Sequence, residues 1–193
     1  DASEDMLMVA NEKKYEENSN TMFLCQKAEE LDLFGTIDCA VSVLDTINHI
    51  DTIEKVQKAI EKISLFMNMG GVFVFDMNTP YKHKKILGNN VFFYDMDEVY
   101  CIWHNSYDDK NYKTDIELDF FIKNEDDDNY QRYNEAFSEY SYDIFTIIEM
   151  LNDCGFDLLG CYDDYTDDEV TYDSQRVTFV AKKTKTIFKD ELK

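Results

Sequence analysis

Two side chains that could accept a proton, His49 and Asp76, each follow a short apolar run in this sequence. The runs span residues 37–44 and 71–75. Imidazole and carboxylate groups act as general bases near neutral pH, so both residues are candidates for removing a proton from a bound substrate. The alternative for His49 is a simple contact at the start of a helix. The catalytic interpretation requires elements that bring the ends of the two runs together.

A βαβ unit would bring them together. Between the two runs, apolar residues recur at the spacing of one helix face, at Ile53, Val56, Ile60, Ile63, Phe66 and Met67. Runs that are continuously apolar indicate strands buried on both faces. We therefore expect an α/β fold with an open, mostly parallel sheet and helices on both of its faces. Ligands of such sheets bind beyond the carboxyl ends of the strands, so the sequence predicts a small-molecule site there.

Further elements follow from periodicity and capping signals. Helices are predicted at residues 3–18, 52–68 and 143–154, and strands near residues 21, 37, 71, 156 and 175, the last of them antiparallel. Asp51 or Thr52 is expected to cap the second helix, and Gly70 and Gly71 to end it. From 81 to 141 aromatic and polar residues alternate, as in an antiparallel β-meander. We expect a core of residues 1–80 and 142–193, with 81–141 inserted as a lobe that covers the substrate.

Composition restricts the possible partners. The 193 residues carry a formal net charge of -22, which argues against nucleic acid and anionic membranes, since both select clustered Lys and Arg. No apolar run reaches the ~20 residues of a membrane span. The five cysteines contain no Cys-x-x-Cys pair and lie mostly in apolar runs, which favours free thiols in a cytoplasmic protein. We expect a small-molecule partner; the sequence does not predict an oligomeric state.

The opening DASEDMLMVANEK resembles the segment D-x-S-x-x-M-L-x-x-A of class I S-adenosylmethionine-dependent methyltransferases, within a small bacterial subgroup. In that family an acid after the second strand binds the ribose of the cofactor. FLCQKAEELDL resembles the adenine-binding segment, with Lys27 where the family has Asp, and VLD resembles the loop that passes the methionine part. The resemblance implies a Rossmann-like fold with the insertion after its fifth strand, S-adenosylmethionine as cofactor, and cofactor contacts at Asp1, Ala2, Met6, Lys27, Ala28, Val43, Leu44 and Asp45.

The glycine-rich loop of that family, which contains Gly-x-Gly, has no counterpart among the six glycines of the sequence. The position of Asp1 predicts that this loop precedes the chain, which would be truncated at its N-terminus. We expect the 193-residue chain by itself to bind little cofactor and to be inactive. The function expected of the intact protein is methyl transfer to a small molecule. The alternative is a non-catalytic α/β interaction module that has lost cofactor binding.

Five residues are candidate substrate contacts, at strand ends or in the meander: Asn48, Asn78, Trp103, Arg132 and Glu135. Packing of the meander is the alternative for Trp103, and a cross-strand ion pair is the alternative for Arg132. No metal site is expected. The acidic runs at 125–128 and 163–169 lack the glycine and the alternating carboxylates of a calcium loop, which favours solvated turns.

Overall fold

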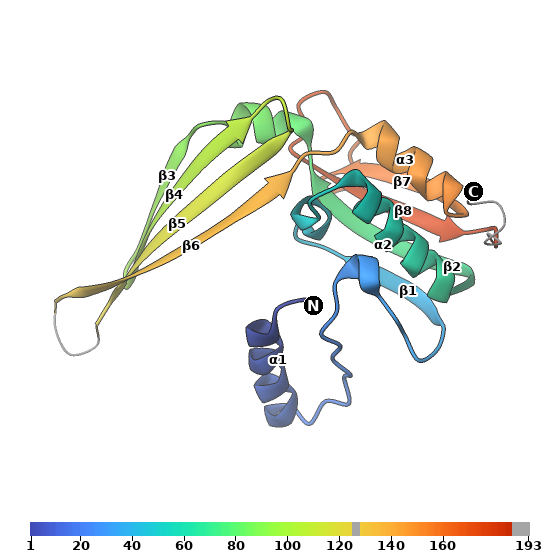
Figure 1. The fold of residues 1–193 in the computed structure, drawn as a ribbon, viewed down its shortest axis with the longest axis horizontal. Helices are drawn as coiled ribbons and strands as arrows, with labels where there is room; N and C mark the ends of the chain where they lie inside the picture. Colours follow the sequence, from blue (N-terminus) through green and yellow to red (C-terminus); the bar gives the residue numbers. More distant parts are fainter. Residues whose placement is uncertain (125–127, 187–193) are drawn as a thin grey trace.

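The computed structural model describes residues 1–124 and 128–186 and contains two four-stranded sheets (Figure 1). Sheet A has the strand order β1-β2-β8-β7, and sheet B has the order β3-β4-β5-β6. Sheet A consists of β1 (Ile37–Ser42), β2 (Met67–Asn78), β7 (Phe156–Asp163) and β8 (Arg176–Lys183). Sheet B consists of β3 (Val91–Met96), β4 (Val99–Asp108), β5 (Lys113–Lys123) and β6 (Tyr130–Tyr140).

The predicted βαβ unit is confirmed. β1 and β2 are parallel neighbours, with Ala40 opposite Phe73, and α2 (Ile53–Phe66) connects them. The side chain of Thr52 accepts a hydrogen bond from the backbone N–H of Lys55, so Thr52 is the N-cap of α2. β8 runs antiparallel to both β2 and β7, which confirms the closing hairpin and its antiparallel last strand.

The expectation of helices on both faces of sheet A is wrong for the described residues. α2 and α3 (Ile144–Asp153) lie on the same face (Figure 1), where the Ser64 hydroxyl donates to the carbonyl oxygen of Cys154 at 2.6 Å. On the opposite face, Val74 and Val180 are only half-buried. The prediction followed from the continuously apolar strands, but in the described part of the chain α2 and α3 cover only one face of sheet A.

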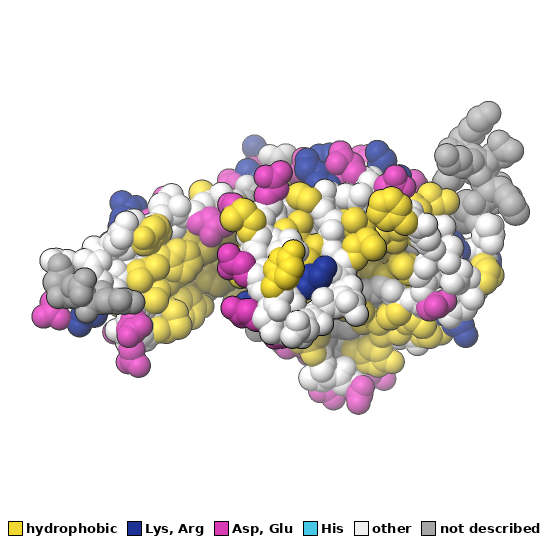
Figure 2. Space-filling view, turned by 90° about the horizontal axis from the view of Figure 1, so that it is seen from below, with side chains coloured by type: hydrophobic (Ala, Val, Ile, Leu, Met, Phe, Trp, Pro, Cys, Tyr) yellow, Lys and Arg dark blue, Asp and Glu magenta, His cyan; other side chains and the backbone are white. Residues whose placement is uncertain are grey.

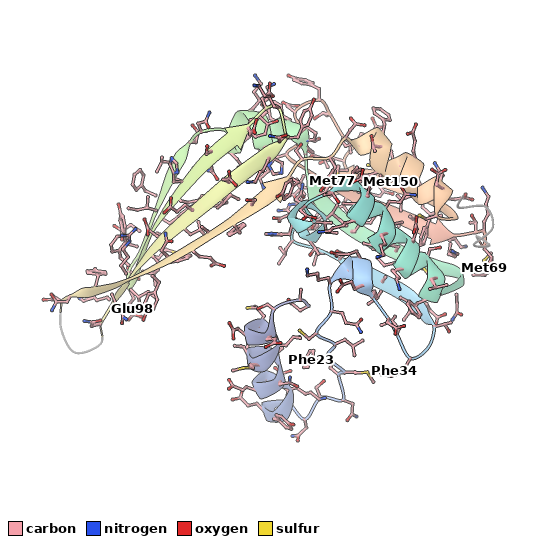
Figure 3. All side chains as sticks on the ribbon, in the orientation of Figure 1. Phe23, Phe34, Met69, Met77, Glu98 and Met150 are labelled. Atoms are coloured by element: carbon pink, nitrogen blue, oxygen red, sulfur yellow. The ribbon has the colours of Figure 1, made fainter. Side chains whose placement is uncertain are left out.

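The core lies between sheet A and these two helices. Phe73 stacks on Phe75 at 4.5 Å between ring centroids, and Phe75 stacks on Phe179 at 4.7 Å. Met77 of β2 is fully buried, and Met150 of α3 packs against the same cluster (Figure 3). Each fully buried side chain of this size stabilises the fold by roughly 1.5–3 kcal/mol, so this cluster fixes how α2 and α3 sit on the sheet.

The boundary between α2 and β2 differs from the prediction. The helix ends at Phe66 and β2 begins at once with Met67, so Gly70 and Gly71 lie inside the strand and do not end the helix. The pairing of β1 with β2 shifts register between Ile37 and Cys39. A Cβ atom on Gly71 would lie 2.9 Å from the carbonyl oxygen of Asp38, so glycine allows the close approach of the two strands.

The N-terminal segment packs less than its sequence suggested. α1 (Glu4–Glu16) buries none of its residues, and Met6 and Met8 of the predicted apolar stripe are 60% and 63% exposed. Phe23 and Phe34 follow α1 on the segment that leads to β1 (Figure 3), and Phe34 is 93% exposed. The pattern predicted the helix correctly, but no described element covers its apolar side chains.

The predicted strand near residue 21 does not form. The segment is extended and lies beside the first residue, with Gln26 N–H donating to the carbonyl oxygen of Asp1 at 2.9 Å. Within the described ranges no further strand pairs with it, so no ladder results. Its local β-propensity was therefore not sufficient, because a strand also needs a neighbour.

Sheet B projects from sheet A as an antiparallel arm (Figure 1), with Glu98 near its far end (Figure 3). The alternating pattern predicted these strands, but residues 82–87, expected within the meander, form a π-helical turn, η3 (Lys82–Leu87). Paired strands place Trp103, Leu118 and Glu135 on one face, which continues to Thr114 and Glu139 beside η3. We call this the inner face, and the opposite one the outer face. Figure 2 shows hydrophobic side chains gathered along sheet B.

Two expectations concern the whole chain. Among residues 1–124 and 128–186, no helix is long and apolar enough to cross a membrane. All five cysteines are free. Within the acidic run 163–169, Asp163 ends β7 and residues 164–168 form an exposed turn, whereas 125–127 lie outside the described residues.

Candidate functional site

The loop that follows β1 has a strained backbone held by one buried carboxylate. Leu44 and Asp45 both have left-handed backbone conformations, with φ of 59° and 53°, which residues other than glycine adopt at a cost in free energy. Their backbone N–H groups donate to Asp76 at the end of β2, at 2.9 Å from Leu44 and 2.6 Å from Asp45. Asp76 is fully buried. Strain of this kind persists where surrounding contacts over-determine it, often at functional sites.

Arg176, the first residue of β8, completes this anchor. Its Nη1 lies 2.9 Å from Asp76 Oδ1 and its Nη2 lies 3.0 Å from Asp45 Oδ1, so one guanidinium joins both carboxylates. The hydroxyl of Tyr165 donates to the other oxygen of Asp76. Both oxygens of Asp76 are therefore occupied within the chain.

A second network joins the loop to sheet B through two buried amides. The side-chain oxygen of Asn48 accepts from the backbone N–H of Asn78 at 2.8 Å, and its Nδ2 donates to the carbonyl oxygen of Tyr140 at 2.8 Å. Asn48 and Asn78 are 0% and 2% exposed. These contacts fix the carboxyl end of β2 against the end of β6.

Three ionisable groups of η3 and β6 meet this network. The amide Nδ2 of Asn78 donates to Glu139 Oε2 at 3.2 Å, and the Nζ of Lys82 donates to Asn78 Oδ1 at 2.8 Å. His83 is fully buried, with Nδ1 2.8 Å from the hydroxyl of Thr114. Burial lowers the pKa of His83 to about 4, so its ring is neutral at pH 7 and its 3.8 Å approach to Glu139 is not an ion pair.

Asp45, His49 and Glu139 converge beyond the carboxyl ends of β1 and β2. Each offers one oxygen or nitrogen atom within 4.8 Å of the others. Burial, followed by the charge of Asp45, raises the pKa of Glu139 to about 7. His49 has a side chain that is 46% exposed, and its ring lies 5.4 Å from that of Phe137 on the inner face. The cluster offers proton acceptors at the edge where the sequence predicted a site.

The predicted cofactor contacts lie on the N-terminal segment and the loop after β1. Asp1 is exposed, and one of its oxygens accepts the backbone N–H of Ser3 at 2.8 Å, which leaves the other oxygen for a ligand. Ala28 begins the turn η1 (Ala28–Glu30) after Lys27, and in the described ranges its N–H meets no acceptor. Ala2 lies beside Cys25, and Met6 donates its backbone N–H to Ser3. Figure 1 shows the N-terminus near the carboxyl end of β1.

These residues fit the parts of S-adenosylmethionine that the resemblance assigns to them. The free oxygen of Asp1 can accept from a ribose hydroxyl, and the N–H of Ala28 can donate to a ring nitrogen of adenine. The backbone at Val43, Leu44 and Asp45 forms a loop whose shape is fixed by Asp76.

The predicted substrate contacts of sheet B divide between its two faces. Trp103 is on the inner face, with Nε1 donating to Asn105 at 2.6 Å, and Glu135 is exposed on the same face. Arg132 is on the outer face, where its Nη2 lies 2.6 Å from Asp119 Oδ1. Successive residues along a strand point to opposite faces, so Arg132 and Trp103 lie on different faces, and Arg132 forms the cross-strand ion pair that was the alternative to a substrate contact.

Four residues of the site were missed by the sequence analysis: Lys82, His83, Glu139 and Arg176. Lys82 and His83 follow shortly after the predicted strand end at Asn78, a signal that could have identified them. Glu139 and Arg176 had no local signal, since their roles depend on contacts with residues 61 and 100 positions away.

Comparison with known proteins identifies relatives along nearly the whole chain. No family model matches the sequence. "Putative methyltransferase" from Geobacillus sp. (strain WCH70) is 30% identical over 183 residues, which cover 95% of this chain and 74% of the relative. "Putative methyltransferase YqeM" from Bacillus subtilis (strain 168) is 27% identical over 188 residues, covering 97% and 75%.

Solved structures agree with these relatives. A S-adenosylmethionine-dependent methyltransferase from Clostridium acetobutylicum ATCC 824 superposes with a TM-score of 0.89 at 29% identity, covering 96% of this chain and 74% of that one. The CcbJ methyltransferase from Streptomyces caelestis shares the fold, with a TM-score of 0.82 at 15% identity over 95% of this chain and 78% of its own. The chain thus belongs to the class I S-adenosylmethionine-dependent methyltransferases, whose fold is Rossmann-like and whose cofactor is S-adenosylmethionine.

Proposed function

We propose that this protein methylates a small molecule bound between the loop after β1 and the inner face of sheet B. The observation that carries the proposal is the convergence of Asp45, His49 and Glu139 within 4.8 Å of one another at the carboxyl edge of sheet A. Ligands of open α/β sheets bind at this edge. S-adenosylmethionine, when bound, supplies an electrophilic methyl group on a positively charged sulfur.

The chain's own residues would hold the cofactor in three places. Asp1 would accept from the ribose, the N–H of Ala28 would donate to adenine, and the loop 43–45 would contact the methionine part. Ala2, Met6 and Lys27 would flank these contacts. This arrangement extends the family resemblance residue by residue, supported by the second oxygen of Asp1 and the N–H of Ala28, neither of which has a hydrogen-bond partner in the part of the chain that the structure describes.

His49 is the proposed acceptor-side base, because its imidazole is exposed and lies 3.9 Å from Asp45 Oδ2, which can orient it. We assign Asp76 a positioning role, since both of its oxygens already bind the loop, Arg176 and Tyr165. Asn48 is buried within the chain's own network and would likewise position the site.

Sheet B would supply the acceptor-binding wall. Trp103 packs against Phe92 with ring centroids 5.7 Å apart, and Glu135 shares its face. We propose that residues 81–141 cover the acceptor and that residues 1–80 and 142–193 form the catalytic core. Figure 2 supports an apolar wall in that lobe.

The test uses S-adenosylmethionine labelled in its methyl group. The intact protein, for which methyl transfer is expected, is incubated with labelled cofactor and a protein-free cell extract, and the products are separated by mass. We expect label in a low-mass product, and much less with His49→Asn than with the control His104→Asn, which alters an exposed histidine of the outer face. Label found only in protein or nucleic acid would overturn the proposal.

A further inference from the structure

We infer that the methyl acceptor is an amine that enters as an ammonium ion, and that Glu139 is a further catalytic residue that takes up its proton. This inference rests on the proposed function and names its acceptor class. It arises from the charge of the groups around Glu139, which the sequence did not reveal.

Glu139 is a buried carboxyl group that makes no ion pair with Lys or Arg among the described residues. It is 5% exposed, and its donor is the neutral amide of Asn78 at 3.2 Å. Lys82 donates to the other end of that amide. His83, 3.8 Å away, is neutral because burial lowers its pKa to about 4. A buried carboxylate is normally paired with a positive charge or accepts several hydrogen bonds. Glu139 instead accepts one hydrogen bond, from a neutral amide.

The charge of Lys82 lowers the pKa of Glu139, but Lys82 donates to Asn78 rather than to Glu139, and burial and the charge of Asp45 outweigh its effect. Asp45 faces Glu139 from the loop after β1 and is negative. The guanidinium of Arg176 binds Asp45 and Asp76 and lies 3.6 Å from Asp164, so its positive charge is shared among three carboxylates. Burial and the charge of Asp45 together raise the pKa of Glu139 to about 7. One positive charge placed between Asp45 and Glu139 would relieve the repulsion between them.

An ammonium ion suits this place better than other acceptors. It supplies a positive charge and several N–H donors, while the ring face of Phe137, whose centroid lies 5.4 Å from that of His49, can attract a cation. An anionic acceptor would meet Asp45 and Glu139 as like charges. A neutral alcohol would supply no charge, and its hydroxyl is a far weaker acid than an ammonium group.

The proposed step balances as a proton transfer followed by methyl transfer. One N–H proton passes from the ammonium nitrogen to a Glu139 carboxylate oxygen, which leaves the nitrogen with a lone pair. That pair forms the N–CH3 bond while the CH3–S bond breaks and the sulfur keeps its electron pair. The proton on Glu139 can then leave through Asp45 to the exposed ring of His49, 3.9 Å away.

The test follows the carboxyl carbon of Glu139 by NMR in protein labelled with ¹³C-glutamate. The probe is 2-phenylethylamine, and the matched controls are 2-phenylethanol and phenylacetate. We expect Glu139 to titrate with a midpoint near pH 7, and the amine alone to lower that midpoint by about one unit, since a nearby cation favours the charged carboxylate. Glu135, exposed on the same strand, is the internal control and should not respond.

This measurement uses the wild-type protein, so its result does not depend on whether a variant folds. Equal responses to the amine and the alcohol, or a Glu139 titration like that of Glu135, would overturn the inference. The labelled-methyl experiment separates the two proposals. A methylated alcohol or carboxylate product would overturn the amine inference and leave the proposed function intact. If Glu139 responds to the amine as expected but no low-mass methylated product appears, the proposed function is overturned instead.

Discussion

Replacing Asp76 with Asn should destabilise the protein strongly, although only one carboxylate oxygen is replaced by an NH2 group. Asp76 is fully buried and accepts from Leu44 N–H at 2.9 Å, Asp45 N–H at 2.6 Å, Arg176 Nη1 at 2.9 Å and the hydroxyl of Tyr165. An amide keeps one acceptor oxygen and turns an NH2 group toward some of these donors. Arg176 also loses one of its two close carboxylates.

The expected loss follows from these contacts. Removing one partner of a buried ion pair costs about 3–5 kcal/mol, because the other charge stays buried. The loop at residues 44–45 can offset part of this, since its left-handed residues can relax once released, and such strain is worth on the order of 1–3 kcal/mol per residue. We therefore expect Asp76→Asn to lower the free energy of unfolding by about 3 kcal/mol.

Urea unfolding followed by circular dichroism measures this loss. The matched control is Asp157→Asn on β7, whose carboxylate is 54% exposed and 4.0 Å from Lys185. Such exposed pairs contribute about 0–1 kcal/mol, so the control should stay near wild type. A loss below about 1 kcal/mol for Asp76→Asn would refute the idea that this residue anchors the loop.

Three further predictions concern other parts of the chain. Thr52→Ala should cost about 1 kcal/mol by removing the N-cap of α2, while Ser3→Ala should leave global unfolding unchanged because α1 buries no residue. Glu139→Gln should change the pH dependence: the folded pKa of about 7 exceeds the ordinary 4.5, so wild-type stability falls as pH rises through this window. Relative to wild type, the free energy of unfolding of the variant should therefore rise by about 3 kcal/mol as the pH rises through this window. Parallel curves of stability against pH for the two proteins would contradict the raised pKa. Arg132→Ala should lower the free energy of unfolding by less than about 1 kcal/mol and leave acceptor methylation unchanged. Impaired methylation would instead indicate that Arg132 contacts the acceptor.

Local patterns in the sequence predicted the βαβ unit because each element carries its own signal. The apolar runs at 37–44 and 71–75 and the helical spacing between them need no distant partner to be recognised. Thr52 as N-cap follows from the same local chemistry. The predicted strand near residue 21 failed for the opposite reason, since its composition was suitable but no second strand lies beside it.

The site depended on contacts that periodicity does not reveal. Glu135 and Glu139 lie on the same strand and face, yet only Glu139 reaches the end of β2 and is buried, because η3 and Thr114 enclose that end of sheet B. Arg176 opens a strand 100 residues after Asp76, and only the order of sheet A brings the two together. The carboxyl edge was predictable, whereas the residues that complete it were not.

The most direct test of the proposed cofactor site maps S-adenosylhomocysteine on the ¹⁵N-labelled protein by NMR. No Gly-x-Gly sequence is present, so we expect weak, millimolar binding, with shift changes at the amides of Ala28, Leu44 and Asp45. These changes should weaken with Asp1→Asn and persist with the control Asp5→Asn, which alters an exposed acid of α1. No change at these amides, or equal changes along the outer face of sheet B, would contradict the site and favour a non-catalytic interaction module.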